Sequence, residues 1–301
     1  MRSTLVATML LLSLWACKTG PDPELEAIAA LEKEVDAGAS AEKMEELVAL
    51  YEKYIERHPD ETENNANFLH KAAYIQFNGR RYLAAVQFLK EALKQYYDSD
   101  KTPDNALFLA SIYKAHLNSP AIGDAAYYAF LQAFPNHEKA AFVRDSVLVQ
   151  PMDLTADVDS LRSKLFDEKA SRYNTEVSND FIGTCEMYAL LLPDDEKAPD
   201  LLFEAARTAG YIRAFPKAVE LYDWAYAKYP DFPKASQALF MMAFTYDNEM
   251  HNVEKARSLY EEFLKKYPDD EFTDDAQVLL QNLGKSEEEI LKDLQKKKKK
   301  G

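Results

Sequence analysis

Apolar residues recur every three or four positions along most of this chain, and prolines close many of these runs. The clearest run, FPKAVELYDWAYAKYP, covers residues 215–230 and returns 38 residues later, at 253–268, as VEKARSLYEEFLKKYP. Seven of the sixteen aligned positions are identical. This spacing predicts amphipathic helices, and repetition at a period of roughly 20 to 50 residues is typical of a solenoid. We therefore expect stacked helix pairs, each covering the apolar face of its neighbour.

The same spacing predicts helices over most of the remaining chain. A weaker copy of the repeat, MEELVALYEKYIERHP, covers residues 44–59 and keeps the final proline. The expected helical hairpins are 23–59, 65–98, 101–135, 157–192 and 200–230, followed by the pair that ends at Pro268 and by a capping helix at 273–283. Within 157–192 we expect one helix at 157–173 and a second at 176–192.

The repeat period fails once, in the middle of the chain. Pro193 and Pro230 are 37 residues apart, whereas Pro135 and Pro193 are 58 apart, which is not a multiple of the period. We expect an extra or offset helix around VLVQPMDLTA, residues 147–156, with a hinge or subdomain boundary there. The expected organisation is N-terminal hairpins in 25–146, an irregular junction at 147–156, and C-terminal hairpins with the capping helix in 157–284.

Composition favours helices and argues against nucleic-acid binding. The 301 residues include only 8 glycines and carry a formal net charge of −15 at pH 7. Few glycines disfavour a sheet-rich fold with many tight turns. Because a nucleic-acid binder usually presents a basic stripe, we expect an acidic, solvated surface and no nucleic-acid partner.

The N-terminus has the features of a targeting signal. Residues 1–16, MRSTLVATMLLLSLWA, place one arginine before an apolar run that is too short for an ordinary transmembrane helix. The segment Leu14-Trp15-Ala16-Cys17 resembles the bacterial lipobox, although Trp15 departs from the usual small residue. That resemblance implies cleavage before Cys17, acylation of its thiol, and a lipid anchor with a tether over 17–24. An ordinary signal peptide or a buried N-terminal helix is the alternative.

The sequence contains no recognisable catalytic or metal-binding motif. None of the five histidines is three or four residues from another histidine or from a cysteine, so no local zinc site is expected. Glycine-rich nucleotide loops and the G-x-S-x-G elbow are absent. Cys185 lies in an apolar helical run, which favours a small buried hydrophobe over a reactive thiol. We expect no cofactor and no enzyme activity.

The residues at fixed helix positions resemble the tetratricopeptide repeat. The C-terminal pair matches the family pattern at Leu239, Met242, Ala243, Tyr246, Ala256, Tyr260, Phe263 and Pro268. The preceding pair matches it at Leu202, Ala205, Ala206, Ala218, Tyr222, Ala225 and Pro230, with Ala209 where tyrosine is usual. The resemblance implies an all-α fold, a right-handed superhelical solenoid of antiparallel helix pairs. The repeats are longer than the common 34 residues, as in periplasmic tetratricopeptide lipoproteins and coordinators of bacterial envelope assembly, which this chain resembles.

In that family the first helix of each pair lines a concave groove. The matching positions here are Asn67, His70 and Tyr74, then Asp200, Phe203 and Arg207, then Gln237, Phe240 and Phe244. Phe203 and Phe240 occupy the same repeat position, and facing a solvent-filled groove they would anchor an extended peptide or a helix. The alternative is that these aromatic side chains pack between helices.

The resemblance implies a non-catalytic interaction scaffold, a lipid-anchored envelope protein that docks protein partners or peptide segments in envelope assembly or maintenance. Lys18, directly after the predicted lipidation site, favours the outer membrane, and we expect the protein on its periplasmic side. The alternative is a solenoid lipoprotein that binds a small molecule or glycan for uptake, which a deep, mostly closed pocket near 147–156 would favour. Lys296–Lys300 ends a charged tail, 285–301, which is expected to be a solvated terminus; contact with anionic lipid or polysaccharide is its alternative.

Overall fold

The computed structural model describes residues 22–148 and 153–286, together with residues 288, 289, 291 and 292. The predicted lipidation site Cys17 and the run Lys296–Lys300 lie outside these residues. The described helices are α1 (Pro23–Asp36), α2 (Ala41–Arg57), α3 (Thr62–Asn78), α4 (Tyr82–Gln95), α5 (Thr102–Ala115), α6 (Pro120–Ala133), α7 (Ala140–Phe142), α8 (Leu154–Ser163), α9 (Thr175–Leu191), α10 (Ala198–Tyr211), α11 (Phe215–Lys228), α12 (Ala235–Asn248), α13 (Val253–Lys266) and α14 (Thr273–Asn282). A one-turn π-helix η1 (Val143–Val147) follows α7, and two short strands, β1 (Phe166–Asp167) and β2 (Arg172–Tyr173), form a hairpin before α9.

The chain forms two compact units, residues 1–60 and 61–301. The described part of the first unit is the α1–α2 hairpin, which buries Ile28 and Leu47. The Tyr51 hydroxyl of α2 donates a hydrogen bond to Glu32 Oε1 of α1 at 2.7 Å. The first predicted hairpin is therefore present, held by a small apolar seam, by this hydrogen bond and by the ion pairs Lys43–Glu34 and Arg57–Glu24 between the two helices.

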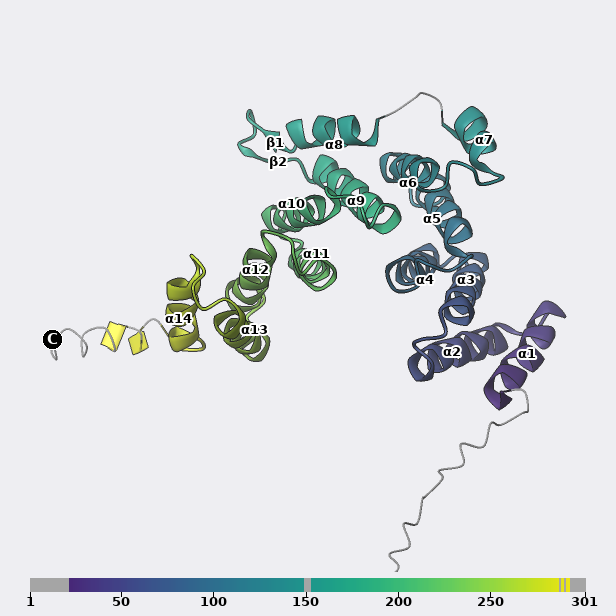
Figure 1. Ribbon diagram of the computed structural model, residues 1–301, viewed down its shortest axis with the longest axis horizontal. Coiled ribbons are helices and arrows are strands. Elements are labelled where there is room, and N and C mark those ends of the chain that lie inside the picture. Colours follow the sequence, from purple (N-terminus) through teal and green to yellow (C-terminus); the bar gives the residue numbers. More distant parts are fainter. Residues whose placement is uncertain (1–21, 149–152, 287, 290, 293–301) are drawn as a thin grey trace, which may run out of the picture. The chain divides into compact units, whose positions relative to one another are not determined.

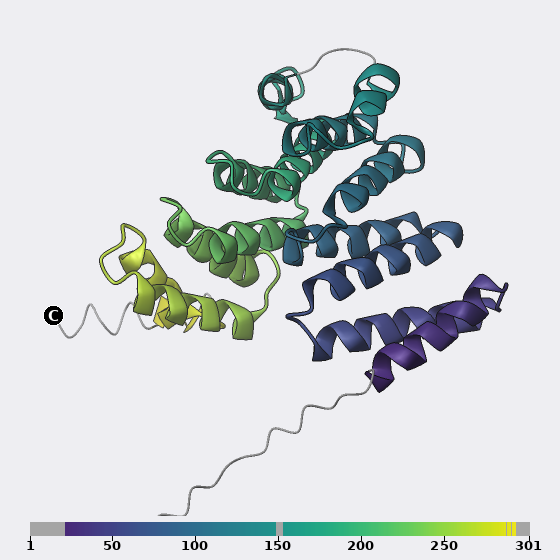
Figure 2. The same cartoon turned by 45° about the vertical axis from the view of Figure 1, so that its right-hand side comes forward.

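The second unit is a series of antiparallel helix pairs, α3–α4, α5–α6, α8–α9, α10–α11 and α12–α13, followed by α14. The pairs follow one another along the unit in both views (Figures 1 and 2). Small side chains such as Ala85 and Ala206 are fully buried where helices approach closely, and rings such as those of Tyr222 and Tyr260 fill the spaces between them. The predicted all-α solenoid is confirmed. We call α3, α5, α8, α10 and α12 the first helices and α4, α6, α9, α11 and α13 the second helices.

The irregular segment around 147–156 changes how two neighbouring pairs meet. The second helix α6 packs against another second helix, α9, whereas elsewhere a second helix meets the first helix of the next pair. Gly183 of α9 permits this approach, because a Cβ atom there would lie 2.7 Å from Ile122 Cγ1 of α6. One hydrophobic core continues on both sides of the segment. The change of packing partner between α6 and α9 therefore lies inside one compact unit, residues 61–301.

The helix expected at 157–173 is shorter than predicted. α8 ends at Ser163, and the β1–β2 hairpin follows. Within the hairpin, Asp167 Oδ1 accepts hydrogen bonds from the backbone N–H groups two and three residues further on. The Asn174 side chain then caps the start of α9. These bonds from side chains to the backbone compete with helix formation, so residues 164–174 turn back instead of extending α8.

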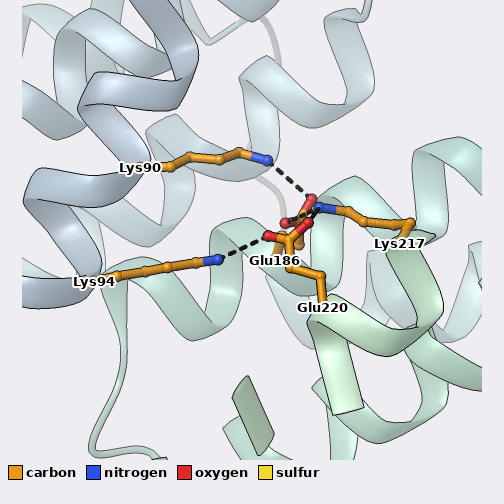
Figure 3. Close-up of polar contacts among 5 residues, drawn as sticks. All are labelled: Lys90, Lys94, Glu186, Lys217 and Glu220. Atoms are coloured by element: carbon orange, nitrogen blue, oxygen red, sulfur yellow. Dashed lines mark hydrogen bonds and ion pairs between the residues drawn. The ribbon is translucent and has the colours of Figure 1, made fainter. Parts of the chain in front are cut away.

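A network of ion pairs joins three second helices, α4, α9 and α11 (Figure 3). Glu186 of α9 accepts from Lys90 Nζ of α4 at 3.0 Å and from Lys217 Nζ of α11 at 2.6 Å. Lys217 also pairs with Glu220 at 3.0 Å, and Glu220 pairs with Lys94 at 2.9 Å. The side chains of Lys90 and Glu186 are only 9% and 3% exposed. We call these five residues the clasp, since they connect helix pairs that precede the irregular segment in the chain with helix pairs that follow it.

The charges of the clasp depend on each other. Burial by itself would raise the pKa of Glu186, but Lys90 and Lys217 hold that pKa below its ordinary value. Against the effect of burial, Lys217 and Lys94 lower the pKa of Glu220 to about 2. A buried charge that lost its partner would be strongly unfavourable, so the network requires α4, α9 and α11 to keep their relative positions.

Replacing Gly183 by alanine should lower the free energy of unfolding by about 1–3 kcal/mol, because the new methyl group meets Ile122 inside the α6–α9 contact. Gly210→Ala in α10 is the matched control, since a Cβ there has nothing within 4 Å. That control should raise stability by about 0.5–1 kcal/mol through helix propensity. Urea unfolding of both variants tests the contact, and equal effects at the two positions would contradict it.

Glu186→Gln should lower the free energy of unfolding by about 3–5 kcal/mol near neutral pH, because Lys90 keeps its buried charge without a carboxylate. The folded pKa of Glu186 is lowered, so its contribution is complete above its unfolded pKa of about 4.3 and is lost as the pH falls below it. Denaturant titrations between neutral and acidic pH should therefore show the two proteins converging in acid. Glu34→Gln removes an exposed pair with Lys43 and should have little effect at any pH. A difference between wild type and Glu186→Gln that stayed constant with pH would refute this assignment.

Candidate partner-binding groove

A shallow hollow lies between the first helices α10 and α12, with α11 beneath it. It has a volume of about 200 Å³ and an apolar lining. We call it the α10–α12 groove; its principal residues are Phe203, Arg207, Tyr211, Gln237, Met241 and Phe244. Gln237, Met241 and Phe244 along α12 are spaced four and three residues apart, and Phe203, Arg207 and Tyr211 along α10 four residues apart, which puts each set on one helix face.

The floor of the groove is aromatic and rigidly packed. Phe203 and Tyr222 are both 2% exposed, and their ring centroids lie 5.3 Å apart in an edge-to-face arrangement. Burial raises the pKa of Tyr222, so its hydroxyl stays protonated at physiological pH. Phe244 and Met241 are half-buried at the sides. A ligand group that entered this hollow would therefore be apolar and about the size of one side chain.

One positive charge stands at the mouth of the groove. Arg207 is exposed, and its guanidinium donates a hydrogen bond to the Tyr211 hydroxyl at 3.1 Å. That hydrogen bond is the main cause of the raised pKa of Arg207. The Tyr211 ring in turn stacks on Tyr173 of the β1–β2 hairpin, with ring centroids 4.5 Å apart. Among the described residues, none of the ion pairs includes Arg207, so its charge is available to a ligand.

The structure brings together four of the nine predicted groove residues. These are Phe203, Arg207, Gln237 and Phe244. Phe203 lies in the floor and is only 2% exposed, so the expectation of a solvent-facing anchor is wrong for it, and it packs between helices against Tyr222. Asp200 lies outside the groove and pairs with Lys234 at 2.6 Å.

Phe240 does not face the groove. It is 6% exposed and stacks on Phe272, with ring centroids 4.8 Å apart, while Phe263 of α13 lies 5.7 Å away. The expectation of a solvent-facing anchor is therefore corrected for Phe240, and the packing alternative describes it. The reason is that α12 turns this position toward α13 and the loop before α14, where burying a whole ring is favourable.

The three predicted residues of α3 belong to a different surface. Asn67 is partly exposed and Tyr74 is 55% exposed. His70 Nδ1 lies 2.7 Å from the Asn105 side-chain oxygen of α5, and burial lowers the pKa of His70. None of the three lines the α10–α12 groove. In Figure 1, α4 and α11 lie between α3 and α12.

Sequence reasoning missed three residues at the groove. Tyr211 and Met241 lie four residues after Arg207 and Gln237, so the helical period contained a signal for both. Tyr173 does not line the groove but stacks on Tyr211. It comes from the hairpin that replaced the end of a predicted helix, and the repeat pattern gave no signal for it. An inserted element therefore packs against one of the groove residues.

A second hollow, of about 450 Å³, lies between α8, α9 and α10. Its lining includes Thr155, Arg162, Tyr188, Lys197 and Glu204. Arg162 is paired there with Glu204 at 2.8 Å, and Lys197 is exposed at the rim. This hollow adjoins the irregular segment but is polar and open to solvent, unlike the closed pocket that small-molecule binding would favour.

The remaining chemistry of the described residues is structural. Cys185 is fully buried and unpaired, and burial raises the pKa of its thiol, as expected for a small core residue. Among the residues that the structure describes, no group of three or more His, Cys, Asp or Glu side chains is placed to hold a metal ion. Within the same part of the chain, no helix combines the length and apolarity needed to cross a membrane.

Comparison with known proteins identifies one repeat directly. No curated protein matches the chain. Among solved structures, the chain is similar to the TPR2AB domain of yeast Sti1 in a complex described as TPR2AB-domain:pHSP90, with 13% sequence identity and a TM-score of 0.31 over 85% of this chain and 96% of that chain. A family profile described as tetratricopeptide repeat matches residues 237–270. Those residues include nearly all of α12 and the whole of α13, so the C-terminal helix pair of this all-α solenoid is similar to a tetratricopeptide repeat.

Proposed function

We propose that this protein is a non-catalytic interaction scaffold whose α10–α12 groove captures a peptide segment of a protein partner. The observation that carries this proposal is a mainly apolar hollow in which Arg207 is in no ion pair, while the carboxylate in the lining, Glu249, already pairs with Arg213 at 3.9 Å. Pockets for small molecules usually enclose roughly 300–1,000 Å³ and bury most of the ligand. A hollow of about 200 Å³ is smaller than that and suits one side chain of a longer segment.

The ligand that fits best presents an apolar side chain next to a carboxylate. The apolar group would cover the rings of Phe203 and Phe244, while Arg207 would meet the carboxylate in a charge-assisted hydrogen bond. Tyr211 already holds the guanidinium, so little side-chain freedom remains to be lost on binding. The packed floor supports anchoring because fully desolvated aromatic pockets carry most of the energy of an interface.

The groove is tested with the full chain and a displayed library of random short peptides. Selected peptides should share an apolar residue beside Asp, Glu or a C-terminal carboxylate. Arg207→Ala should weaken the best of them about tenfold or more, measured by fluorescence anisotropy. Arg257→Ala is the matched control, because Arg257 is exposed on α13 outside the groove. Peptides that bind both variants with wild-type affinity would refute the site.

We place this scaffold at the bacterial cell envelope, anchored by lipid at Cys17 on the periplasmic side of the outer membrane and acting in envelope assembly or maintenance. Support comes from the short apolar run, the lipobox-like Leu14-Trp15-Ala16-Cys17 and the following Lys18. Two or more acyl chains would give stable attachment, since each buried methylene contributes about 0.8 kcal/mol. The lengthened repeats are consistent with this setting.

Cys17→Ala should abolish lipid attachment and leave the protein unprocessed or released from membranes. Fractionation of bacteria that express each form, combined with metabolic labelling by a fatty-acid analogue, provides the measurement. The control is Cys185→Ala, which changes the other cysteine of the chain inside the core and should keep the label. A labelled, membrane-bound Cys17→Ala protein would show that the anchor lies elsewhere.

A small-molecule or glycan carrier remains the second candidate, favoured by the volume of about 450 Å³ between α8, α9 and α10. Its ionic groups already pair with one another, which leaves few polar groups unsatisfied for a sugar or a metabolite. Glu204→Gln together with Thr155→Ala would reduce binding at this hollow and leave peptide capture at the α10–α12 groove unchanged. The two functions can therefore be separated in one set of variants.

A further inference from the structure

Six aromatic rings form a continuous surface on the first helices α3 and α5, the start of α4 and the residue after α5, outside the groove described above. They belong to His70, Tyr74, Phe77, Tyr82, Phe108 and His116, which we call the α3–α5 aromatic face. Phe108 contacts three of the other rings; its ring centroid lies 5.2 Å from that of Phe77 and 6.4 Å from that of Tyr74. Tyr82 stacks on His116 at 4.6 Å, which extends the surface to the α3–α4 turn.

The rings of this face are accessible. Tyr74 is 55% exposed and His116 is also exposed, while the other four rings are half-buried. Leu83, in the first turn of α4, is 69% exposed. Contiguous exposed apolar surface on a folded protein usually marks a place where another molecule binds.

The charge around this face is opposite to that of the protein as a whole. The chain carries 51 acidic residues, yet residues 64–90 and 105–123 contain no aspartate or glutamate. These two stretches include α4 to Lys90 and almost all of α3 and α5. The basic residues Lys71, Arg80 and Arg81 lie in the first stretch, before the clasp residue Lys90. The two stretches that carry the rings of the face therefore contain basic residues and no acidic ones.

Arg80 lies at one end of the face, and Lys101 and Lys139 lie at the other. The backbone N–H of Arg80 donates to the carbonyl of Phe77 at 2.9 Å, which closes the turn between Phe77 and Tyr82. Arg80 is exposed, and no ion pair of the described structure includes it. At the other end, the acid nearest His70 is Asp104, which already accepts from Lys101 at 3.1 Å and from Lys139 at 3.3 Å. Two ammonium groups around one carboxylate leave that end positive as well.

We propose that the α3–α5 aromatic face is a second docking site, and that its occupant is an acidic segment of a protein partner carrying aromatic or aliphatic side chains. The side chains of the segment would pack on Tyr74 and Phe108, and its carboxylates would meet Arg80 and the cations near His70. Complementary charge at such a surface steers the encounter and selects the partner. The exposed rings supply the apolar contact area.

A protein segment fits this face better than a nucleic acid does. The rings lean against one another edge-on or stacked, so few ring faces are free for base stacking. The net charge of −15 would also repel a long polyanion. A short segment with a few carboxylates experiences mainly the local cations, because charges beyond roughly 8–10 Å are screened at physiological salt.

The second site would act independently of the α10–α12 groove. In Figure 1, the second helices α4 and α11 lie between α3–α5 and α10–α12, and the clasp holds α4 to α9 and α11. A single extended peptide following one continuous row of first helices would have to cross this layer. Two separate segments can instead bind at the same time, so the chain would bridge two partners.

The experiment compares the full chain with its Tyr74→Ala/Arg80→Glu double variant in selections from a displayed library of random short peptides. Both residues are exposed, so circular dichroism and urea unfolding should match wild type. Peptides recovered by wild type but not by the double variant should be rich in Asp and Glu beside aromatic residues. A synthetic copy of the best one should bind the double variant about tenfold more weakly or worse, and more weakly in high salt.

Arg207→Ala provides the control for the other groove, since it should leave this peptide's affinity unchanged. The proposal is overturned if the recovered peptides show no acidic enrichment, if the double variant binds them as wild type does, or if Arg207→Ala abolishes their binding. An oligothymidine that bound more tightly than the peptide, and lost binding in the double variant, would assign the face to single-stranded nucleic acid instead. These outcomes are separate from those of the groove test, because each site has its own variant.

Discussion

The position of Glu186 is the constraint on which the second unit depends. Its carboxylate is almost completely buried and is shared by Lys90 from α4 and Lys217 from α11. Buried ion pairs add little net stability compared with apolar packing, but removing one partner is very costly. Such a network therefore selects one arrangement of helices over alternatives with similar apolar burial. Here it selects the arrangement in which α4 and α11 both lie against α9.

The α6–α9 contact makes that arrangement possible. In the other pairs a second helix packs against the first helix of the next pair. If every pair packed in this way, the first helices would form one continuous row. At the irregular segment two second helices meet instead, with Gly183 admitting Ile122. The second helices become an inner layer, and the rows of first helices on either side of the junction become separate surfaces (Figure 1). Two separate surfaces of first helices follow from one change in packing partner.

The candidate groove was predictable where repeat position decides orientation. Arg207, Gln237 and Phe244 lie on one face of their helices, and the tertiary structure only had to bring α10 and α12 together. Phe240 fails for a reason that a single helix does not contain: the loop before α14 supplies Phe272, which covers its ring. Tyr173 can stack on the groove residue Tyr211 because local hydrogen bonds of Asp167 and Asn174 end α8 early. The period of a repeat does not encode such insertions.

The sequence by itself determined the helices, their pairing into hairpins and the acid-free stretches at 64–90 and 105–123. Apolar spacing and closing prolines are local properties, and short turns leave antiparallel packing as the available way to bury each apolar face. Only the tertiary structure decided which helices meet across the irregular segment. The contacts of Lys90 and Lys94 with Glu186 and Glu220 join residues 96 and 126 positions apart. From the sequence alone, charged residues at helical spacing are predicted to lie on a solvated surface. Only the fold shows which of them are buried, because burial is a property of the packed chain and not of any one of its helices.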